Sequence, residues 1–357
     1  MSDLGPKRYR IADYAVPVAR APRAPHSWRI RRRTIALCSW FYAGVLLVLR
    51  IAGSWPGADF WPLHLFFFGP RWVLSIPLLL LLGLAIWRRL WWSAVALGLA
   101  SIAFIGIWGF NVPWRYFFWA SAAETSQPSF RVLTCNVQRG DLKIPNLARL
   151  VQEQQPDVVL LQECSLPDPR VVLGEKGWHI KKTGEFCLAS RHPILDFQEL
   201  RRPDKTYRII AIRAHLAWSM AEIPIVGVHL MTPRRGLEPI IASGPGGLNR
   251  FRDIARVQRY ESQLLSQWIR DTPTSIILAG DFNLTAEHPL YHRDWSAYND
   301  AFTWTGWGLG QTMFTQSIGL RIDHVLCGAS WQPRSCRIGP DVGSAHRPLV
   351  VELALCP

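Results

Sequence analysis

Six segments of the sequence carry, at or next to a strand-like run, a polar residue of a type that takes part in catalysis. They are Asn136, Glu163, His229, Asp281 (with Asn283 two residues later), Asp323 and His346. Taken singly, an acidic or amide residue after a strand is usually a solvated turn residue. Six such positions in succession instead predict side chains that gather at one site.

The oxygen donors in this set suit a hard divalent cation. Glu163 supplies a carboxylate, and Asn136 and Asn283 supply amide oxygens. Mg²⁺ and Mn²⁺ prefer such all-oxygen sites and bind through one or two carboxylates together with substrate phosphate. The sequence therefore predicts a Mg²⁺ or Mn²⁺ site around Glu163.

The remaining residues can transfer protons and stabilise charge. Asp281 can orient and deprotonate the water that attacks a phosphoester. His346, held in one tautomer by a buried carboxylate at Asp323, can donate to the negative charge that builds up, and His229 can hold a non-bridging oxygen. The set favours metal-dependent phosphoester hydrolysis.

Two arginines follow His229 closely, in Thr232-Pro233-Arg234-Arg235-Gly236. Guanidinium groups bind phosphate through paired hydrogen bonds, so Arg234 and Arg235 are candidate substrate-binding residues. A solvated turn without a ligand explains them equally well, and both interpretations stay open.

The elements that must position these residues alternate between strand and helix patterns. Strand-like runs cover 131–136, 157–162, 209–215, 223–229, 275–279, 322–327 and 349–355, and helical spacing covers 142–154 and 250–270. Helices that return the chain from strand to strand predict an α/β layered domain over 130–357.

The residues before 130 have a different character. Residues 1–33 hold nine Lys and Arg without apolar periodicity, and we expect a disordered basic arm. Uncharged apolar runs follow at 34–49, 72–87 and 90–114, within a membrane region of about three transmembrane helices over 34–120, and 121–129 forms a linker. The first two runs are short and need snorkelling arginines, and 60–70 could add an interfacial segment.

Positive charge predicts the orientation of these spans. Lys and Arg concentrate in the arm and at Arg88 and Arg89, whereas only Arg50 and Arg71 bound the loop between the first two runs. Because positive charge marks the cytoplasmic side, three crossings give a multi-pass protein of the cell (inner) membrane with a cytoplasmic N-terminus and an extracytoplasmic domain. If the second run, which contains Pro77, does not cross, the domain lies on the cytoplasmic side.

Composition sets the wider limits. The 357 residues are 49% hydrophobic with 18 Trp, which excludes a disordered chain or a disulfide-stapled miniprotein. Residues 1–125 hold 14 Lys and Arg against four Asp and Glu, so most of the net charge of +14 lies beside the apolar runs and does not favour nucleic acid. The first run could be a cleaved signal peptide, but the two later runs would still hold the chain in the membrane.

The cysteines leave the redox state open. Six of the seven lie in the domain, without the Cys-x-x-Cys spacing of a zinc site. Cys135 and Cys164 each adjoin a proposed site residue and could pair in an oxidising compartment. We favour the simpler interpretation, that they are buried free thiols.

The ordered motifs TCNV, LLQE, VGVHL, AGDFN, RIDHVL and SAHRP resemble the endonuclease/exonuclease/phosphatase superfamily over about residues 130–355. This resemblance implies N-terminal transmembrane α-helices followed by an α/β four-layered sandwich of the deoxyribonuclease type. The membrane-tethered bacterial branch of that superfamily is the most similar.

Motif by motif, the resemblance also implies roles. For the metal it implies Glu163 as the ligand with Asn136 beside it. For catalysis it implies positioning of the nucleophilic water by Asp281, orientation of that water and the phosphate by Asn283, a dyad of Asp323 and His346, and a phosphoryl contact by His229.

One position departs from the family pattern. The last motif of the family is Ser-Asp-His, whereas this sequence has Ser344-Ala345-His346. The departure predicts weaker or single-metal binding, because the missing Asp is often assigned to the metal. It also leaves an alternative open, a catalytically degenerate membrane protein that binds phosphate ligands or acts as a scaffold.

We therefore predict a membrane-anchored, Mg²⁺- or Mn²⁺-dependent phosphoester hydrolase that cleaves a phosphodiester of nucleic acid or of a phospholipid headgroup with metal-activated water. The implied partners are this substrate and the membrane, and the sequence indicates no protein partner. Apolar residues at 303–309 would support a lipid substrate if they were exposed near the site, but not if they pack in the core.

Overall fold

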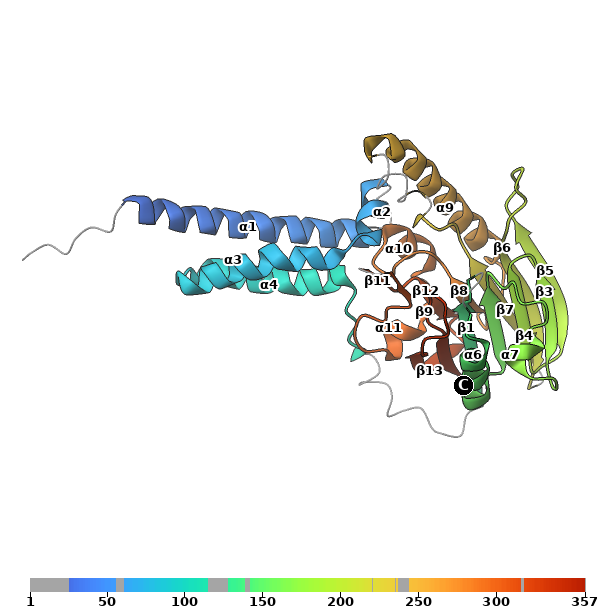
Figure 1. Cartoon of the computed structure of the whole chain (residues 1–357). Coiled ribbons are helices and arrows are strands. Elements are labelled where there is room, and N and C mark those ends of the chain that lie inside the picture. Colours follow the sequence, from blue (N-terminus) through green and yellow to red (C-terminus); the bar gives the residue numbers. More distant parts are fainter. Residues whose placement is uncertain are drawn as a thin grey trace, which may run out of the picture.

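Long helices project from a layered α/β body in the computed structural model of the chain (Figure 1). The structure describes residues 26–55, 61–114, 128–138, 142–219, 221–234, 236, 244–315 and 318–356. Most of the predicted basic arm and of the predicted linker at 121–129 lies outside these residues, as does Arg235.

In the described residues before β1 (Ser129–Asn136), the N-terminal part holds four α-helices and one 3₁₀ helix. They are α1 (His26–Ser54), α2 (Trp61–Phe68), η1 (Arg71–Leu74), α3 (Ser75–Trp87) and α4 (Trp91–Trp108). By length and composition, α1 and α4 could each cross a membrane; α2 and η1–α3 meet at a bend of 92° and add a third candidate only if they act as one span. Outward-facing apolar residues such as Leu37 and Trp92, 72% and 81% exposed, give these helices a surface that suits lipid.

These helices differ from the predicted runs mainly at their ends. Helix α1 begins at His26, so the last residues of the stretch expected to be a disordered arm are helical. Helix α4 stops at Trp108, well before residue 114, because Gly109 adopts a left-handed conformation (φ 85°) that ends the helix. Helix α2 occupies the stretch expected to be interfacial.

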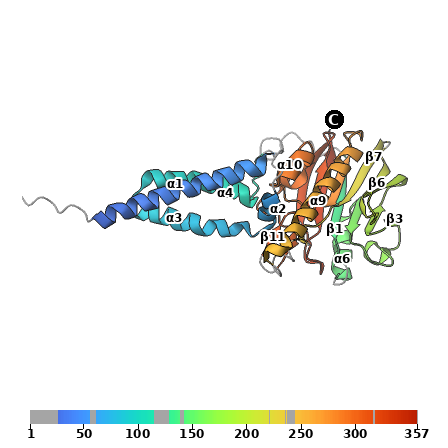
Figure 2. The ribbon, with the colours of Figure 1, turned by 90° about the horizontal axis from the view of Figure 1, so that it is seen from above.

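Helices α1, α3 and α4 lie side by side and point away from the body in both views (Figures 1 and 2). Helix α1 runs toward the body, α3 runs away from it and α4 returns. At the far end, Arg32 Nη2 donates a hydrogen bond to the carbonyl oxygen of Arg88 at 3.2 Å. The arginines at the start of α1 and those between α3 and α4 therefore share the end that is remote from the body.

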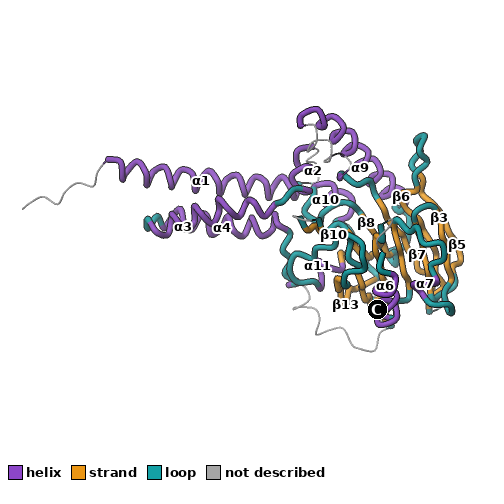
Figure 3. The backbone as a smooth tube through the Cα atoms, viewed as in Figure 1, coloured by secondary structure: helices purple, strands orange, loops and turns teal. Residues whose placement is uncertain are grey.

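The body holds two six-stranded sheets, which are the strand-rich part of Figure 3. The first has the order β13-β14-β1-β2-β4-β3 and the second β5-β6-β7-β8-β12-β9. Their bounds are β1 Ser129–Asn136, β2 Val158–Gln162, β3 His179–Thr183, β4 Phe186–Ser190, β5 Ile194–Arg201, β6 Ile209–Trp218, β7 Ala221–His229, β8 Ile277–Asp281, β9 Asn299–Asp300, β12 Asp323–Cys327, β13 Trp331–Ile338 and β14 Leu349–Leu355. A hairpin of β10 (Met313–Phe314) and β11 (Gly319–Leu320) stands apart from both sheets.

Three apolar layers hold the body together. Residues of both sheets, such as Val132, Leu160 and Ile225, bury each other in the central layer. On the first sheet pack α6 (Ile144–Gln154) and α7 (Arg170–Leu173), and on the second pack α9 (Leu248–Trp268) and α10 (Pro289–Trp295), beside the short α11 (Ala301–Thr305). The predicted four-layered α/β sandwich is thus confirmed.

The seven predicted strands and two predicted helices of the body are present within a few residues of their expected bounds. Strands β3, β4, β5 and β13 were not among the predicted runs. Strand β3 has the polar sequence HIKKT and lies at a sheet edge, where apolar alternation is not required. Strand β4 is apolar and buried but has only five residues.

All seven cysteines are free thiols. Cys135 and Cys164 are buried in the layer under α6, as the simpler interpretation expected. The nearest thiol partner of Cys164 is Cys187, whose hydrogen bond lowers the pKa of Cys164 to about 7.

A buried junction joins the helices to the body. Arg71 Nη1 contacts Glu287 Oε2 at 2.8 Å and the carbonyl oxygen of Ile107 at 2.7 Å. Arg321, in the body, lies 3.9 Å from the other oxygen of Glu287. Asn111, just after α4, donates to the carbonyl oxygen of Gly306 at 2.6 Å. The helices are therefore packed onto the body through specific polar contacts.

Candidate active site

Strand register brings the predicted residues to one edge of the sandwich. Strands β1 and β2 are parallel and end together at Asn136 and Gln162, next to Glu163. Strands β7 and β8 are also parallel and pair His229 with Asp281, and antiparallel β12 pairs Asp323 with Asp281. Because the two sheets pack face to face, these ends lie close together.

Backbone conformation fixes how the strands end. Gly280 has φ 144°, and a Cβ there would lie 2.1 Å from the carbonyl oxygen of Val228 on the neighbouring strand. Only glycine therefore allows β8 to pair closely with β7 just before Asp281. Glu163 (φ 51°) and Asn283 (φ 50°) adopt the left-handed conformation, which costs energy and is common at functional sites.

Asn136 links two carboxylates. Its Nδ2 donates to Glu163 Oε1 at 3.0 Å and to Asp281 Oδ2 at 3.1 Å. The backbone N–H of Asn283 donates to Asp281 Oδ1 at 2.9 Å, and its amide donates to the carbonyl oxygen of Leu230 at 3.0 Å. Each oxygen of Asp281 is thus held by a hydrogen bond.

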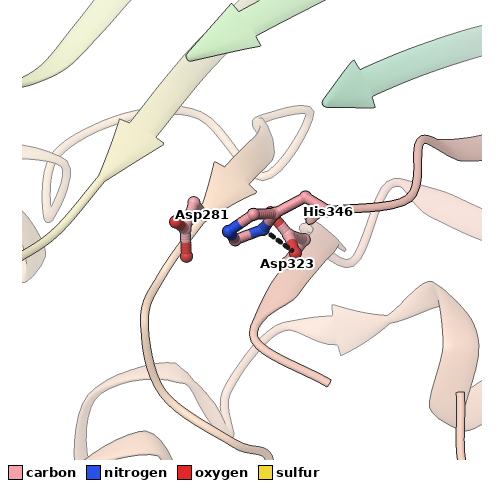
Figure 4. A group of neighbouring side chains, drawn as sticks. All are labelled: Asp281, Asp323 and His346. Atoms are coloured by element: carbon pink, nitrogen blue, oxygen red, sulfur yellow. Dashed lines mark hydrogen bonds and ion pairs between the residues drawn. The ribbon is translucent and has the colours of Figure 1, made fainter. Parts of the chain in front are cut away.

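Asp323 and His346 form a buried pair beside Asp281 (Figure 4). His346 Nδ1 lies 2.8 Å from Asp323 Oδ2, and one ligand atom from each of Asp281, Asp323 and His346 lies within 4.8 Å of the others. The Ser344 hydroxyl accepts from the His346 N–H at 3.0 Å and donates to the carbonyl oxygen of Asn136 at 2.7 Å. The loop that carries His346 is therefore fixed to the end of β1.

Burial and neighbouring charges shift two pKa values. Burial, and then the negative charge of Asp323, raise the pKa of Asp281 to about 7. Burial alone would lower the pKa of His346, but the Asp323 carboxylate outweighs it and raises that pKa to about 9. At neutral pH the cluster therefore holds a carboxyl group poised to accept a proton and an imidazolium that can donate one.

His229 joins the cluster from the second sheet. Its Nε2 lies 3.7 Å from Glu163 Oε1 and 4.0 Å from Asp281 Oδ2, and its Nδ1 lies 3.6 Å from Glu185 Oε2. All seven catalytic and metal candidates thus lie in one group at this edge.

The two candidate substrate arginines are not shown to join that group. Arg234 is exposed, and its N–H donates to the Thr232 hydroxyl at 3.3 Å; Arg235 is outside the described residues. Two other arginines, which the sequence did not single out, border the site instead. Arg201 and Arg208 line a pocket of about 460 Å³ whose wall includes Glu163 and His229. The only sequence signal for them is the Arg-rich turn between β5 and β6.

The donor set fits a hard divalent cation. Glu163 is partly open to the pocket, with a side chain 30% exposed, and carboxylate or amide oxygens surround it. Among the described residues, Oδ1 of the buried Asp323 has no hydrogen-bond partner, so the cluster holds more acceptor capacity than the protein satisfies. Such an excess of oxygen acceptors suits Mg²⁺ or Mn²⁺.

Ala345 offers no ligand atom from its side chain. Its N–H donates to Gln138 Oε1 at 3.2 Å, and its carbonyl oxygen accepts from the Phe314 N–H at 2.8 Å. The backbone there is held on both sides, so the substitution removes a carboxylate without opening the loop.

Comparison with known proteins was made for sequence and for structure. Residues 133–346, more than half of the chain, match the model of the Endonuclease/Exonuclease/phosphatase family. A humanized TDP2 from D. rerio is similar at 19% identity and TM-score 0.47, over 63% of this chain and 98% of that one. A family protein from Bacteroides thetaiotaomicron is similar at 17% identity and TM-score 0.49, over 65% of this chain and 97% of that one. The human Nocturnin catalytic domain is similar at 17% identity and TM-score 0.47, over 64% of this chain and 94% of that one. No curated protein matches the chain.

Proposed function

Because the chain belongs to the Endonuclease/Exonuclease/phosphatase family, we propose that it is a membrane-anchored, divalent-metal-dependent hydrolase of phosphodiesters. The observation that carries the proposal is the buried group of Asp281, Asp323 and His346 beside Glu163 and Asn136. We assign residues 34–120 to the membrane region and 130–357 to the catalytic domain.

Each residue has a task in this reaction. Mg²⁺ or Mn²⁺, held by Glu163 with Asn136 beside it, would supply positive charge that neutralises the phosphoryl oxygens. Asp281, with a pKa of about 7, accepts the proton of the attacking water. Asn283 fixes the carboxylate of Asp281 through its backbone N–H.

Two histidines bind the phosphoryl group. His346, with a pKa of about 9, is protonated at neutral pH and donates a hydrogen bond to an oxygen on which charge develops. Asp323 keeps it protonated and oriented through Nδ1. His229, at the end of β7 in the second sheet, holds a second phosphoryl oxygen.

The anchor is supported by the arrangement of the helices. The body lies at one end of the α1–α3–α4 bundle, and Arg31, Arg32, Arg33, Arg88 and Arg89 lie toward the other. Positive charge faces the cytoplasm, so a bundle that crosses the cell membrane has a cytoplasmic N-terminus and an extracytoplasmic catalytic domain. In this orientation η1–α3 completes the second crossing and α2 lies at the interface.

The test is turnover of bis(p-nitrophenyl) phosphate by the full chain in detergent, with Mg²⁺ or Mn²⁺ and with EDTA. Metal-dependent turnover is expected, with a loss of at least ~100-fold in His346→Gln, because one positioned proton donor contributes about that much. His179→Gln, an exposed position on β3, is the matched control and should be unaffected.

The Ala345→Asp variant distinguishes the proposed enzyme from the rival function, a catalytically degenerate protein that binds phosphate ligands. If only this variant turns over substrate, the native protein is a phosphate-ligand binder or scaffold with a degenerate site. If instead the native chain is active, and Ala345→Asp raises this activity further and needs a lower metal concentration, the result supports an enzyme whose metal binding is weakened.

A further inference from the structure

The pocket beside the catalytic group is larger than a single phosphate needs. Its volume of about 460 Å³ falls in the range of pockets that hold a small organic ligand. One wall is Glu163 and His229, and the other is the β5–β6 turn, with Arg201, Thr206 and Arg208. The pocket therefore extends from the reaction centre to a pair of guanidinium groups.

Arg208 is held in place by a buried carboxylate. Glu261 of α9 is fully buried, and Arg208 Nη1 lies 3.1 and 3.2 Å from its two oxygens. Glu261 Oε2 also accepts from the backbone N–H of Met231, just after β7, at 2.6 Å, and Arg202 Nη1 donates to Oε1 at 2.9 Å. Helix α9 thus fixes the β5–β6 turn against the strand that carries His229.

The charges of the pocket leave room for an anion at its outer end. Glu163 and Glu185 are the acidic lining residues, and both lie beside His229 at the inner end. At the outer end, Arg201 pairs with Glu199, whereas the side chain of Arg208 bonds to Glu261 through Nη1. The three arginines of this turn face three carboxylates, because Arg202 pairs with Asp204 as well as with Glu261. The exposed Lys205 adds a fourth basic residue, so the turn and its partners keep one net positive charge.

The pocket lies away from the membrane. Strands β5 and β6 lie at the end of the body that is remote from the helical bundle in both views (Figures 1 and 2). Three strand spacings separate β6 from β12, which is roughly 15 Å, whereas the headgroup layer reaches only about 5–8 Å beyond the hydrocarbon core. The exposed Trp307 does not line this pocket but packs against Phe110 at the end of α4. A lipid of the anchoring membrane is therefore poorly placed to enter.

We propose that this pocket binds a second phosphoryl group of a water-soluble phosphoester, with Arg201 and Arg208 as specificity-determining residues. This inference rests on the proposed function. The scissile phosphoryl group lies at Glu163 and His229, and the second lies at the guanidinium groups, which bind phosphate through charge-assisted hydrogen bonds. The preferred substrate then carries two phosphoryl groups.

The first test compares two chromogenic esters that differ by one phosphate. They are the 5′-(p-nitrophenyl phosphate) of thymidine with and without a 3′-phosphate, assayed with the full chain in detergent and Mg²⁺. The second phosphate should raise kcat/KM roughly 10-fold, the effect of one charge-assisted hydrogen bond. Arg201→Gln and Arg208→Gln should each reduce this advantage to less than ~3-fold by the same principle.

Arg256→Gln is the matched control. Arg256 is an exposed arginine paired with Asp253 on α9, as Arg201 is exposed and paired with Glu199, and it does not line the pocket. The Arg256→Gln variant should keep the full increase in kcat/KM that the second phosphate gives. If Arg208→Gln fails to fold because Glu261 loses a partner, Arg201→Gln still decides the question. Equal kcat/KM for the two esters in the native chain would overturn the inference while leaving the hydrolase intact.

A binding measurement separates the inference from the proposed function. Calorimetry in EDTA should find that thymidine 3′,5′-bisphosphate binds about 10-fold more tightly than thymidine 5′-monophosphate, and that Arg201→Gln removes the difference. This difference in affinity is expected even if the protein turns over no ester. In that case the proposed function is wrong, but the proposed binding site is still supported. Equal affinities overturn the site.

Nanodiscs test the lipid alternative. Phosphatidylinositol 4-phosphate carries two phosphates, and in the same nanodisc as the protein it should not inhibit turnover of the soluble bisphosphate ester more than phosphatidylinositol does. Inhibition that depends on Arg201 would overturn the inference of a water-soluble substrate in favour of a lipid headgroup.

Discussion

At the scale of single residues, Asp323 controls the protonation of His346. The carboxylate raises the pKa of His346 to about 9, against the effect of burial. In the proposed mechanism His346 acts in its protonated form, so activity should fall as pH rises through about 9. Asp323→Asn removes the charge, and the pKa of His346 should then fall because burial is no longer opposed.

This prediction is checked by pH–rate profiles of the native chain and Asp323→Asn. The variant should lose at least ~100-fold in kcat, and its alkaline limb should move to lower pH. Asp253→Asn, an exposed carboxylate on α9, is the control. An alkaline limb that stays in place would mean that His346 is not the group that titrates.

The sequence predicts some of the site and not the rest, for a physical reason. Asn136, Glu163, His229 and Asp281 follow apolar strands that must enter the core, so their convergence at one edge follows from strand order; their roles remain predictions. Glu261 gave no such signal, because it lies among charged residues on a helix that would be expected to be solvated. Its burial depends on arginines more than fifty positions away, which only the fold brings near.

At the scale of elements, the close pairing of β7 and β8 depends on Gly280. Gly280→Ala would place a methyl group 2.1 Å from the Val228 carbonyl oxygen, at φ 144°. We expect a loss of about 3 kcal/mol or more in stability, together with lost activity, since His229 and Asp281 end these strands. Thermal unfolding of the full chain in detergent measures the loss.

Gly246→Ala is the control for this substitution. Gly246 has no heavy atom within 4 Å of an added Cβ and no positive φ. It should change stability by less than ~0.5 kcal/mol, as exposed substitutions do. Equal melting temperatures for the two variants would show that β7 and β8 can separate without harm.

At the scale of the whole molecule, the helical bundle stabilises the catalytic body through Arg71 and Glu287. Burial alone would raise the pKa of Glu287, but Arg71 and Arg321 outweigh it and hold this pKa below its usual value. Glu287→Gln leaves both arginines buried without their carboxylate, so we expect a loss of about 3 kcal/mol above pH 5.5.

The sign of the pH dependence follows from the lowered pKa. The contribution of Glu287 is fully present above the pKa of the unfolded chain, about 4.3, and is lost as pH falls through the folded value. The difference in melting temperature between the native chain and Glu287→Gln should therefore shrink below about pH 4.5. Glu153→Gln, an exposed carboxylate paired with Arg149 at 4.0 Å, should show no difference at any pH. A constant difference for Glu287→Gln would contradict the ion-pair account.

The orientation of the bundle predicts the side of the membrane on which the body lies. An alkaline phosphatase fusion at Gln127 should be active and a fluorescent-protein fusion at the same position should be dark, since the three crossings that we propose would place residue 127 outside the cytoplasm. The reverse pattern would exclude three spans with a cytoplasmic N-terminus. The junction also means that such fusions should keep α1 to α4 intact.

The central claim, that Glu163 holds a catalytic divalent metal, is tested most directly by one titration. Turnover of bis(p-nitrophenyl) phosphate by the native full chain and by Glu163→Gln is measured from EDTA to saturating Mg²⁺. We predict turnover that saturates with Mg²⁺ in the native chain and requires at least ~10-fold more Mg²⁺ in Glu163→Gln, in line with the cost of weakening a metal site. Turnover that persists in EDTA, or the same Mg²⁺ dependence in both proteins, would contradict it.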